Sequence, residues 1–383
     1  MIVRNPFSSS CGVSPPHFVG RQDLIQAFKH DLYSTIEGSP RHLAFLGDWG
    51  MGKTSLLHML NKQIKSQHCI PVYIPAYPLD KIEEVINLLF AYFSKSIPKS
   101  LIRSYSKGLS STGFTILGTG IEMKLQEPRA EPQLVLTEVI KSAWKRVEKR
   151  NWNAFVFLID DIDSWAIDTR DPILFILRNV FTELRREGCK VMLTVAARPA
   201  LFSEVRELQE PIVRFFEPHL LGPLREEEVK KAVLTPLENI KIKISSEALK
   251  LIYDLSEGHP FYVQILAYSA VNSSKEGEIN LHTFKEGLID SLHSLVYSSK
   301  FGDIYRKASV NERHILKLLS QEDRILTHGE IIKEASAKFG LSSGTVRTAL
   351  KRLSDKGLVR TPSRSRYTIY TKLFGEAIKR GVL

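Results

Sequence analysis

A glycine-rich run near the amino terminus has the composition and spacing of a phosphate-binding loop. It matches the pattern GxxxxGK[ST] at every fixed position and reads Gly47-Asp48-Trp49-Gly50-Met51-Gly52-Lys53-Thr54. Glycines let such a loop wrap closely around an anion and turn backbone N–H groups toward phosphate oxygens. Lys53 has the reach to contact the β- and γ-phosphates, and the hydroxyl of Thr54 is a ligand for Mg²⁺. The run therefore predicts a binding site for a nucleoside triphosphate.

A second group of residues with catalytic potential ends an apolar run in the middle of the chain. Residues 155–163 read Phe-Val-Phe-Leu-Ile-Asp-Asp-Ile-Asp, so a strand-like segment leads directly into three carboxylates. Asp160 has the position of the acid that holds Mg²⁺ beside a phosphate loop. Asp161 falls where similar ATPases often carry a glutamate that polarises the attacking water, and an aspartate side chain is shorter than that glutamate. Asp163 is a third candidate, and Asp161 and Asp163 are also suited to cap the helix or turn that follows.

Further polar residues near the next apolar run complete the catalytic candidates. Thr194 lies in the strand expected at 190–199, where a polar residue at the tip can sense the γ-phosphate, and Arg198 follows it. Arg185 and Arg186 end the preceding helix, where ring-forming ATPases can supply an arginine to a neighbouring subunit's nucleotide. The alternative for Arg198 is a plain surface residue, and Arg185 and Arg186 are equally suited to interact with the helix dipole.

Alternating strands and helices are predicted around these residues. Strand-like apolar runs occur at 41–47, 71–77, 154–160 and 190–199. Helical periodicity separates them, at 22–36, 55–66, 81–97, 133–149 and 172–188. Near-continuous apolar strands alternating with helices indicate a parallel sheet covered on both faces, which is an α/β fold class. Residues 104–133 break the alternation and are predicted to be an insertion, in which 113–126 resemble a short β-hairpin.

The chain changes character twice after this core. Residues 219–300 are helical without a convincing strand, and the remaining residues end in a strand-turn-strand pattern. Helices at 311–320, 328–340 and 345–356, followed by a hairpin at 357–370, predict a winged helix-turn-helix. We therefore expect three domains. They are an N-terminal arm with the P-loop ATPase core over 1–218, a helical lid over 219–300 and a winged helix domain over 301–383.

Positive charge is concentrated in the last of these domains. The chain of 383 residues has a formal net charge of +11. Residues 301–383 hold 17 Lys and Arg against 8 Asp and Glu, which is +9 and leaves +2 for the first 300 residues. This asymmetry favours double-stranded DNA as a partner, although a winged helix can also dock onto a protein. The candidate DNA contacts start the third helix or lie on the wing: Thr345, Arg347, Thr348, Lys351, Arg360, Arg364 and Arg366.

Composition argues against several other classes of protein. No apolar run approaches the ~18 residues that cross a bilayer, and residues 1–10 lack the apolar centre of a secretion signal. Cys11, Cys69 and Cys189 are far apart and form no CxxC pair, so neither a zinc site nor a disulfide framework is predicted. The expectation is a cytoplasmic protein without a membrane partner.

Several of these segments together resemble the AAA+/STAND class of P-loop ATPases. The resemblance is strongest to prokaryotic ATPases that are similar to origin-recognition proteins and end in a winged helix. It rests on Phe18-Val-Gly-Arg21, the phosphate loop, the carboxylates after residue 159, the strand end before Arg198, and Leu255-Ser-Glu-Gly-His-Pro-Phe-Tyr262. Residues 262–267 lack the arginine that a replication initiator more often carries in this last segment.

The resemblance implies further site residues and makes ATP the expected nucleotide. Val19, Gly20 and Arg21 would lie against the adenine. Gly258, His259 and Pro260 would open a lid helix near the nucleotide, with an ordinary turn before a helix as the alternative. ATP binding would close the lid, and hydrolysis by attack of water on the γ-phosphate would reopen it.

Three functions remain open at this point. The first is a Mg²⁺-dependent ATPase switch that couples nucleotide state to DNA binding in replication, transposition or another mobile-element process. The second is a STAND-type signalling or defence regulator whose winged helix makes protein contacts. The third is an ATP-gated adaptor with negligible turnover. The expected partners are duplex DNA, other proteins and, with ATP bound, further copies of the chain.

Overall fold

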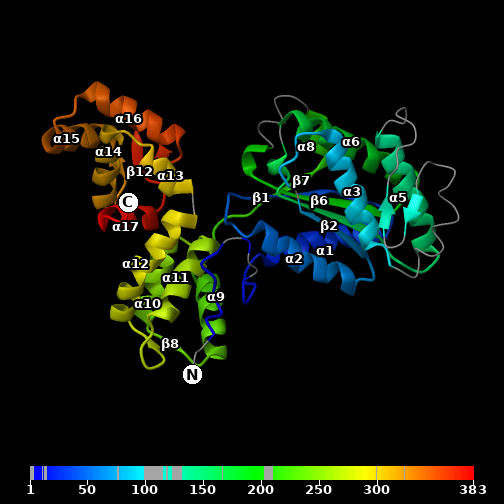
Figure 1. The fold of residues 1–383 in the computed structure, drawn as a ribbon, viewed down its shortest axis with the longest axis horizontal. Coiled ribbons are helices and arrows are strands. Elements are labelled where there is room, and N and C mark those ends of the chain that lie inside the picture. Colours follow the sequence, from blue (N-terminus) through cyan, green and yellow to red (C-terminus); the bar gives the residue numbers. More distant parts are fainter. Residues whose placement is uncertain are drawn as a thin grey trace. The chain divides into compact units, whose positions relative to one another are not determined.

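The computed structural model describes most of the chain. The described residues are 4–10, 12, 15–75, 77–98, 115–117, 120–122, 132–165, 167–201, 210–298, 300–322 and 324–383. They divide into two compact units, one made of residues 21–222 and the other of residues 1–20 with 223–383 (Figure 1). The chain therefore passes between the units twice, at Gly20–Arg21 and at Gly222–Pro223.

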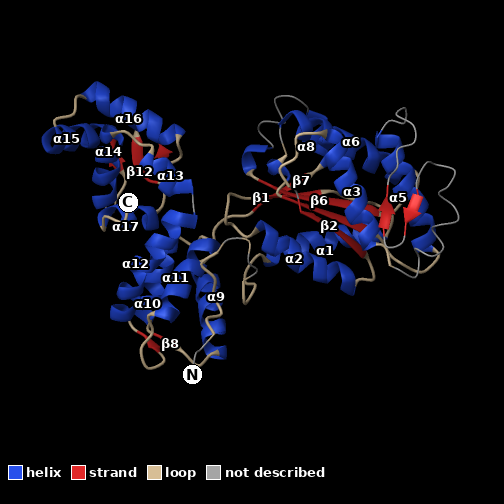
Figure 2. Ribbon diagram, in the orientation of Figure 1, coloured by secondary structure: helices blue, strands red, loops and turns tan. Residues whose placement is uncertain are grey.

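Residues 21–222 are built on a five-stranded parallel sheet (Figure 2). The strands follow the order β2-β5-β6-β1-β7. Their bounds are β1 (Leu43–Leu46), β2 (Ile70–Pro75), β5 (Phe155–Asp160), β6 (Val191–Ala197) and β7 (Glu217–Leu220). All residues of β1, β5 and β6 are buried, as expected for strands covered on both faces. The predicted α/β fold class is confirmed.

Helices cover both faces of this sheet. On one face lie α1 (Gln22–Ile36) and α2 (Lys53–Ser66), and on the other α3 (Ile82–Ser96), α5 (Pro132–Glu148) and α6 (Ile167–Arg186) (Figure 1). Apolar side chains of α3, α5 and α6 form one core with the strands. The short helix α8 (Glu210–Phe215) precedes β7.

A short hairpin lies inside the predicted insertion. The strands β3 (Thr115–Leu117) and β4 (Gly120–Glu122) pair antiparallel, with Ile116 opposite Ile121. The hairpin predicted within 113–126 is therefore confirmed in its paired residues. The rest of the stretch 104–131 lies outside the described residues.

The helical part of the C-terminal unit has its own apolar core. Its main helices are α9 (Glu226–Asn239), α10 (Ser246–Ser256), α11 (Pro260–Asn272) and α12 (Leu281–Ser298). The next helix, α13 (Lys300–Arg306), packs Ile304 and Tyr305 against the core of the winged helix instead. The two-residue strands β8 (Lys243–Ile244) and β9 (Glu278–Ile279) pair beside them. Within the described residues, no helix is both long and apolar enough to cross a membrane.

The N-terminal arm packs on this helical part. Phe7 is buried in its core, and the amide of Asn5 donates to the carbonyl of Tyr268 at 2.8 Å and to Asn272 at 2.7 Å. By its contacts, the arm up to Gly20 therefore clusters with the C-terminal unit, and the expected domain of residues 1–218 stays a prediction. The arm carries no local pattern that indicates which core Phe7 enters.

A winged helix ends the chain. Its helices are α14 (Val310–Gln321), α15 (His328–Phe339) and α16 (Ser343–Asp355). Its antiparallel sheet has the order β10-β12-β11, formed by β10 (Leu326–Thr327), β11 (Val359–Ser363) and β12 (Arg366–Ile369). Gly340 ends α15 with a φ of 65°, in the left-handed conformation that favours glycine.

One further helix, α17 (Lys372–Lys379), joins the winged helix to the helical part. Leu373 and Ala377 are buried in the core of the helical part, whereas Phe374 and Ile378 are buried in the core of the winged helix. The helix α17 therefore contributes side chains to two cores. Because it joins them, the expected lid and winged helix domains cluster as a single unit.

Candidate nucleotide and nucleic-acid sites

The carboxyl edge of the parallel sheet brings the catalytic candidates of the core together. Gly47 follows β1, Asp160 ends β5, and Arg198 follows β6, which lies between the other two strands. Register aligns the ends of β1 and β6, because Leu46 pairs with Ala197 and the amide of Gly47 donates to the carbonyl of Ala197 at 3.0 Å. Ligands of open α/β sheets bind at this edge.

The phosphate loop has the backbone of an anion cradle. Gly50 and Gly52 have φ values of 77° and 86°, so glycine is needed for the turn into α2. Lys53 is the first residue of that helix, whose amino end carries the positive end of its dipole. The Lys53 side chain is only 7% exposed, and its ammonium donates to the carbonyl of Gly47 at 3.0 Å. Arg21 donates to the carbonyl of Met51 at 3.3 Å and so supports the loop.

Asp160 lies beside the loop in a nearly closed environment, with 5% of the residue exposed. Its Oδ2 accepts a hydrogen bond of 2.9 Å from Tyr73, and the hydroxyl of Thr54 also bonds to the carboxylate. Burial raises the pKa of Asp160, while the bond from Thr54 lowers it. The other oxygen, Oδ1, is buried without a hydrogen-bond partner among the described residues.

This arrangement fits Mg²⁺ at the predicted position. Mg²⁺ prefers oxygen ligands and is commonly held by one or two protein groups together with substrate phosphates. The carboxylate of Asp160 and the hydroxyl of Thr54 supply such oxygens, and the unpartnered Oδ1 of Asp160 has the acceptor capacity for a ligand. The two residues predicted from the sequence to hold the metal are thus in direct contact.

Asp161 adopts an unusual backbone conformation at the same edge. Its φ is 46° and its ψ 49°, the left-handed region that residues other than glycine seldom occupy. The side chain is 58% exposed, and its Oδ1 lies 3.7 Å from the ammonium of Lys53. It makes no hydrogen bond that caps the following short helix. The role of Asp161 at the nucleotide stays a prediction.

Asp163, which follows β5, contacts Arg198, which follows the neighbouring strand β6. Its carboxylate accepts a hydrogen bond from the backbone N–H of Arg198 and lies 3.7 Å from the guanidinium Nε. Burial raises the pKa of Asp163, and the bond from Arg198 opposes this shift. We infer that Asp163 positions Arg198. Sequence reasoning missed this pair, because the two residues come from different strands and no local pattern joins them.

Thr194 lies away from the edge where it was expected. It pairs with Leu43, the first residue of β1, and lies three residues before the end of β6. Three strand residues span about 10 Å. The residue is fully buried, and its hydroxyl has no hydrogen-bond partner among the described residues. The structure does not bring Thr194 to the phosphate loop, and Arg198 is the polar residue that follows β6 at that edge.

Arg185 and Arg186 lie at the opposite end of the sheet. The helix α6 returns the chain from the carboxyl end of β5 to the amino end of β6, and both arginines are in its last turn. Both are exposed, and Arg186 lies 3.3 Å from Glu183. Their action on a neighbouring subunit's nucleotide stays a prediction.

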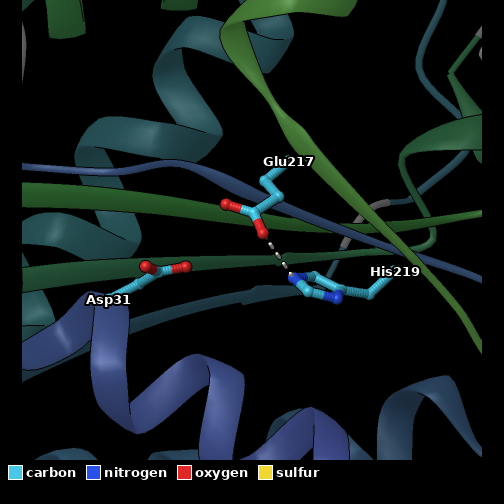
Figure 3. Close-up of side chains that lie close together, drawn as sticks. All are labelled: Asp31, Glu217 and His219. Atoms are coloured by element: carbon cyan, nitrogen blue, oxygen red, sulfur yellow. Dashed lines mark ion pairs between the residues drawn. The ribbon is translucent and has the colours of Figure 1, made fainter.

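A second polar cluster joins α1 to β7 at this far end (Figure 3). Asp31 comes from α1, and Glu217 and His219 come from β7, with 3.8 Å between the carboxylate of Glu217 and Nε2 of His219. The guanidinium of Arg41 lies 3.8 Å from Asp31 and 3.7 Å from Glu217. Burial and the charge of Glu217 raise the pKa of Asp31. Although carboxylates and histidine can bind metals, the guanidinium of Arg41 already compensates the negative charge of Asp31 and Glu217. We therefore interpret the cluster as a structural contact between α1 and β7.

The candidates for the adenine pocket fall in both units. Gly20 packs inside the C-terminal unit, where a Cβ would lie 2.8 Å from Oε1 of Glu228. Pro260 begins α11, and the ring of His259 stacks on Tyr262 with centroids 4.0 Å apart. The assignment of Val19, Gly20, Arg21 and Pro260 to the adenine stays a prediction.

The third helix of the winged helix presents an open polar face. Val346, Leu350 and Leu353 are buried on its inner side, while Arg347, Thr348 and Lys351 are exposed. Thr345 is half-buried and shares a hydrogen bond of 2.9 Å with Ser342, the N-cap of the helix.

The wing contributes three arginines with different surroundings. Arg364 and Arg366 flank the turn between β11 and β12 and are exposed. Arg360 on β11 instead forms an ion pair of 2.8 Å with Glu257 of the helical part and lies over the ring of Tyr370. Most of the residues predicted to bind DNA are thus exposed. Thr345 and Arg360 already make polar contacts within the chain, with Ser342 and Glu257 respectively.

Comparisons with known proteins match both ends of the chain. Residues 17–189 match the family model described as an AAA ATPase domain, and residues 308–378 match the model described as penicillinase repressor. A curated relative is an uncharacterized HTH-type transcriptional regulator of Methanocaldococcus jannaschii, 24% identical over 271 residues. That match covers 67% of this chain and 64% of the relative, which is less than two thirds of the relative's length.

Two solved structures share the fold over nearly their whole length. A Walker-type ATPase of Pyrococcus abyssi superposes with a TM-score of 0.59 at 12% identity, covering 94% of this chain and 96% of that one. The ORC2 protein of Aeropyrum pernix, solved as ADPNP and ADP complexes, also gives 0.59, at 15% identity and 98% coverage of both chains. These likenesses extend the shared fold beyond the two matched segments.

Proposed function

Because the chain contains an AAA ATPase domain followed by a C-terminal winged-helix domain, we propose that it is an ATP-dependent switch whose output is binding to duplex DNA. The nucleotide half of the proposal is carried by one observation. Lys53, Thr54 and Asp160 meet at the carboxyl edge of the sheet, with Asp160 bonded to Thr54 and retaining a buried, unpartnered oxygen.

Each of these residues has a distinct task in the proposed reaction. Lys53, at the amino end of α2, contacts the β- and γ-phosphates of ATP. Thr54 and Asp160 hold Mg²⁺, which neutralises charge on the phosphate oxygens when it is bound. Asp161 orients the water that attacks the γ-phosphorus, and Arg198, held by Asp163, stabilises the developing negative charge. The bond from the γ-phosphorus to the bridging oxygen breaks, releasing ADP and phosphate.

The DNA half of the proposal rests on the exposed cations of the winged helix. Arg347 and Lys351 lie on the outer face of α16, and Arg364 and Arg366 lie at the tip of the wing. Residues at the start of such a helix reach base edges, and wing arginines contact phosphates. The net charge of +9 over residues 301–383 supports a polyanionic partner.

The comparisons support DNA over a protein as the partner. The winged helix matches a repressor family, and the curated relative is named as an HTH-type transcriptional regulator. We therefore favour control of transcription as the process. Replication, transposition or another mobile-element process would use the same surface, and a STAND-type regulator would use it for protein contacts.

Reversal of charge at the wing tip tests the DNA half. A fluorescent duplex is titrated with wild-type protein and with the variant Arg364→Glu/Arg366→Glu, over a series of salt concentrations. The variant is expected to bind more weakly. The slope of log affinity against log salt should become shallower by about 0.9 for each DNA phosphate that the variant no longer neutralises.

The matched control is Lys250→Glu/Lys285→Glu, which makes the same charge change at exposed lysines of α10 and α12. It is expected to keep the wild-type slope. Equal binding by the wing variant and the wild type would reject the wing as a DNA-binding element and favour the protein-docking alternative.

A further inference from the structure

Glu257 connects the helical part of the C-terminal unit to the wing. It follows α10 in the left-handed conformation, with a φ of 51°. Its Oε1 accepts a hydrogen bond of 2.8 Å from the guanidinium of Arg360 on β11, and its Oε2 accepts one of 2.9 Å from the backbone N–H of Lys372. Lys372 is the first residue of α17, where a carboxylate also interacts favourably with the helix dipole. One carboxylate thus holds two segments that are more than a hundred residues away.

The surroundings of this ion pair are packed. Tyr262 of α11 is buried and bonds to Thr371, the N-cap of α17. Leu373 is fully buried in the core of the helical part. Arg360 also lies over the ring of Tyr370, 5.8 Å from its centroid. The position of β11 relative to Glu257 is therefore fixed by a junction of apolar and polar contacts.

The turn that carries Glu257 is tied to the places where the chain passes between the two units. The next residue, Gly258, accepts a hydrogen bond of 2.8 Å from the backbone N–H of Leu224, and a Cβ on Gly258 would lie 2.1 Å from the Leu224 carbonyl oxygen. Leu224 follows directly after the crossing at Gly222–Pro223. At the other crossing, a Cβ on Gly20 would lie 3.2 Å from Leu224. Leu224, which donates to the turn at Gly258, therefore lies next to both places where the chain passes between the units.

We propose that Glu257 is an autoinhibitory latch on the wing, a role that rests on the proposed DNA-binding function. While Arg360 is paired with Glu257, the adjacent carboxylate offsets its positive charge, so the pair attracts a DNA phosphate much less than a free arginine does. The covalent crossings and Leu224 form the route by which a nucleotide-driven change in the ATPase unit reaches the latch. Release of Arg360 adds one cation to the DNA surface.

The test compares duplex DNA binding by wild-type protein, Glu257→Gln, Arg360→Gln and the double variant Glu257→Gln/Arg360→Gln, each over a salt series. Arg364→Gln, at the exposed wing tip, is measured beside them as the reference for loss of one DNA-binding cation. The substitution Glu257→Gln is expected to raise affinity roughly two- to fivefold, the factor that corresponds to an exposed ion pair. It should also steepen the salt slope by about 0.9, the value for one further neutralised phosphate. Without nucleotide, Arg360→Gln alone should bind DNA with nearly the wild-type affinity, because Arg360 is paired with Glu257 in that state. The double variant should lack the increase in affinity that Glu257→Gln shows, because no arginine is left to be released.

The matched control is Glu376→Gln, because Glu376 is also paired with an arginine, Arg380, in the same unit. It removes the same charge from α17 without touching the wing. An increase in affinity from Glu257→Gln that does not exceed the increase from Glu376→Gln would overturn the latch, since it would be a general effect of charge. A decrease in affinity in Arg360→Gln equal to that in Arg364→Gln would also overturn it, because Arg360 would then bind DNA in the latched protein.

Nucleotide dependence gives a second readout. The wild type is titrated with DNA in the absence and presence of a non-hydrolysable ATP analogue, and the ratio of the two affinities is compared with that of Glu257→Gln. The latch predicts that the affinity with the analogue, divided by the affinity without it, is smaller in Glu257→Gln, because Arg360 is already released there. An unchanged ratio would contradict the latch. If none of the proteins binds duplex DNA, the proposed function itself fails. If the wild type binds and Glu257→Gln matches its control, only the latch fails.

Discussion

At the scale of single residues, the proposed chemistry depends on side chains that the parallel sheet gathers at one edge. The phosphate loop and Asp160 could be predicted from the sequence, because a fixed spacing and an apolar run ending in a carboxylate are local patterns. The link from Asp163 to Arg198 could not be predicted, since it joins the ends of two strands. Thr194 lies inside β6, three residues before its end, so it is not at the strand tip where a residue could contact the γ-phosphate.

Removal of the Asp160 charge should lower ATP turnover without unfolding the protein. In Asp160→Asn, turnover of ATP should fall on the order of 100-fold or more, the decrease seen when one group that stabilises the transition state is removed. The fold should persist, because asparagine keeps the shape and can still accept from Tyr73. Steady-state phosphate release measures turnover, and circular dichroism checks the fold. Normal turnover in the variant would contradict the assignment of Asp160.

The same residue predicts a dependence of stability on pH. Burial raises the folded-state pKa of Asp160 above its ordinary value of 3.8, so this carboxylate binds a proton more tightly in the folded nucleotide-free protein than in the unfolded chain. The stabilising contribution of this group is complete below the unfolded pKa and is lost as the pH rises through the folded pKa. Asp160→Asn should therefore flatten this part of the stability curve. Thermal melts across the acid range, without nucleotide or metal, measure the effect, and identical curves would contradict it.

Asp163 should affect turnover through Arg198. In Asp163→Asn, kcat for ATP should fall roughly 10- to 100-fold while KM stays near the wild-type value, because misplacement of a catalytic group slows the chemical step. The variant Arg198→Ala should show a similar decrease, and the double variant should be little slower, because the two residues act as a unit. Asp171→Asn, at an acidic residue paired with Arg170, is the matched control. Additive decreases would show that Asp163 acts independently of Arg198.

At the scale of elements, the main strands and helices follow from apolar runs and periodicity, whereas several shorter elements do not, among them β7 and α17. The strand β7 has the sequence Glu-Pro-His-Leu, largely exposed at a sheet edge, so it has neither an apolar run nor alternation. The helix α17 is short, and its apolar residues serve two cores. The N-cap Thr371 was a local signal for its start.

The double role of α17 predicts that its apolar face stabilises the whole C-terminal unit. Leu373→Ala should lower the free energy of unfolding by about 2–5 kcal/mol, the range for a buried leucine. Val310→Ala, at an exposed residue of α14, is the control and should have little effect. Chemical denaturation measures both. A destabilisation in Leu373→Ala no larger than in the control would show that α17 does not anchor the winged helix.

At the scale of the whole molecule, the chain is a nucleotide-binding unit followed by a unit that combines a helical part with a winged helix. The described residues form three apolar cores, one in the parallel-sheet unit and two in the C-terminal unit. Their grouping into two units could not be predicted, because it depends on where Phe7 and Leu373 are buried. This grouping places the Glu257 turn and the wing in one body.

Binding of duplex DNA with and without nucleotide tests the central claim most directly. Fluorescence anisotropy is measured for the wild type and for Lys53→Ala, each without nucleotide and with a non-hydrolysable ATP analogue and Mg²⁺. The account predicts that the analogue changes wild-type affinity by about fivefold or more, a usual size for coupling between two sites. It predicts no change in Lys53→Ala, which lacks the lysine that contacts the phosphates. Equal wild-type affinity in both conditions would contradict the switch.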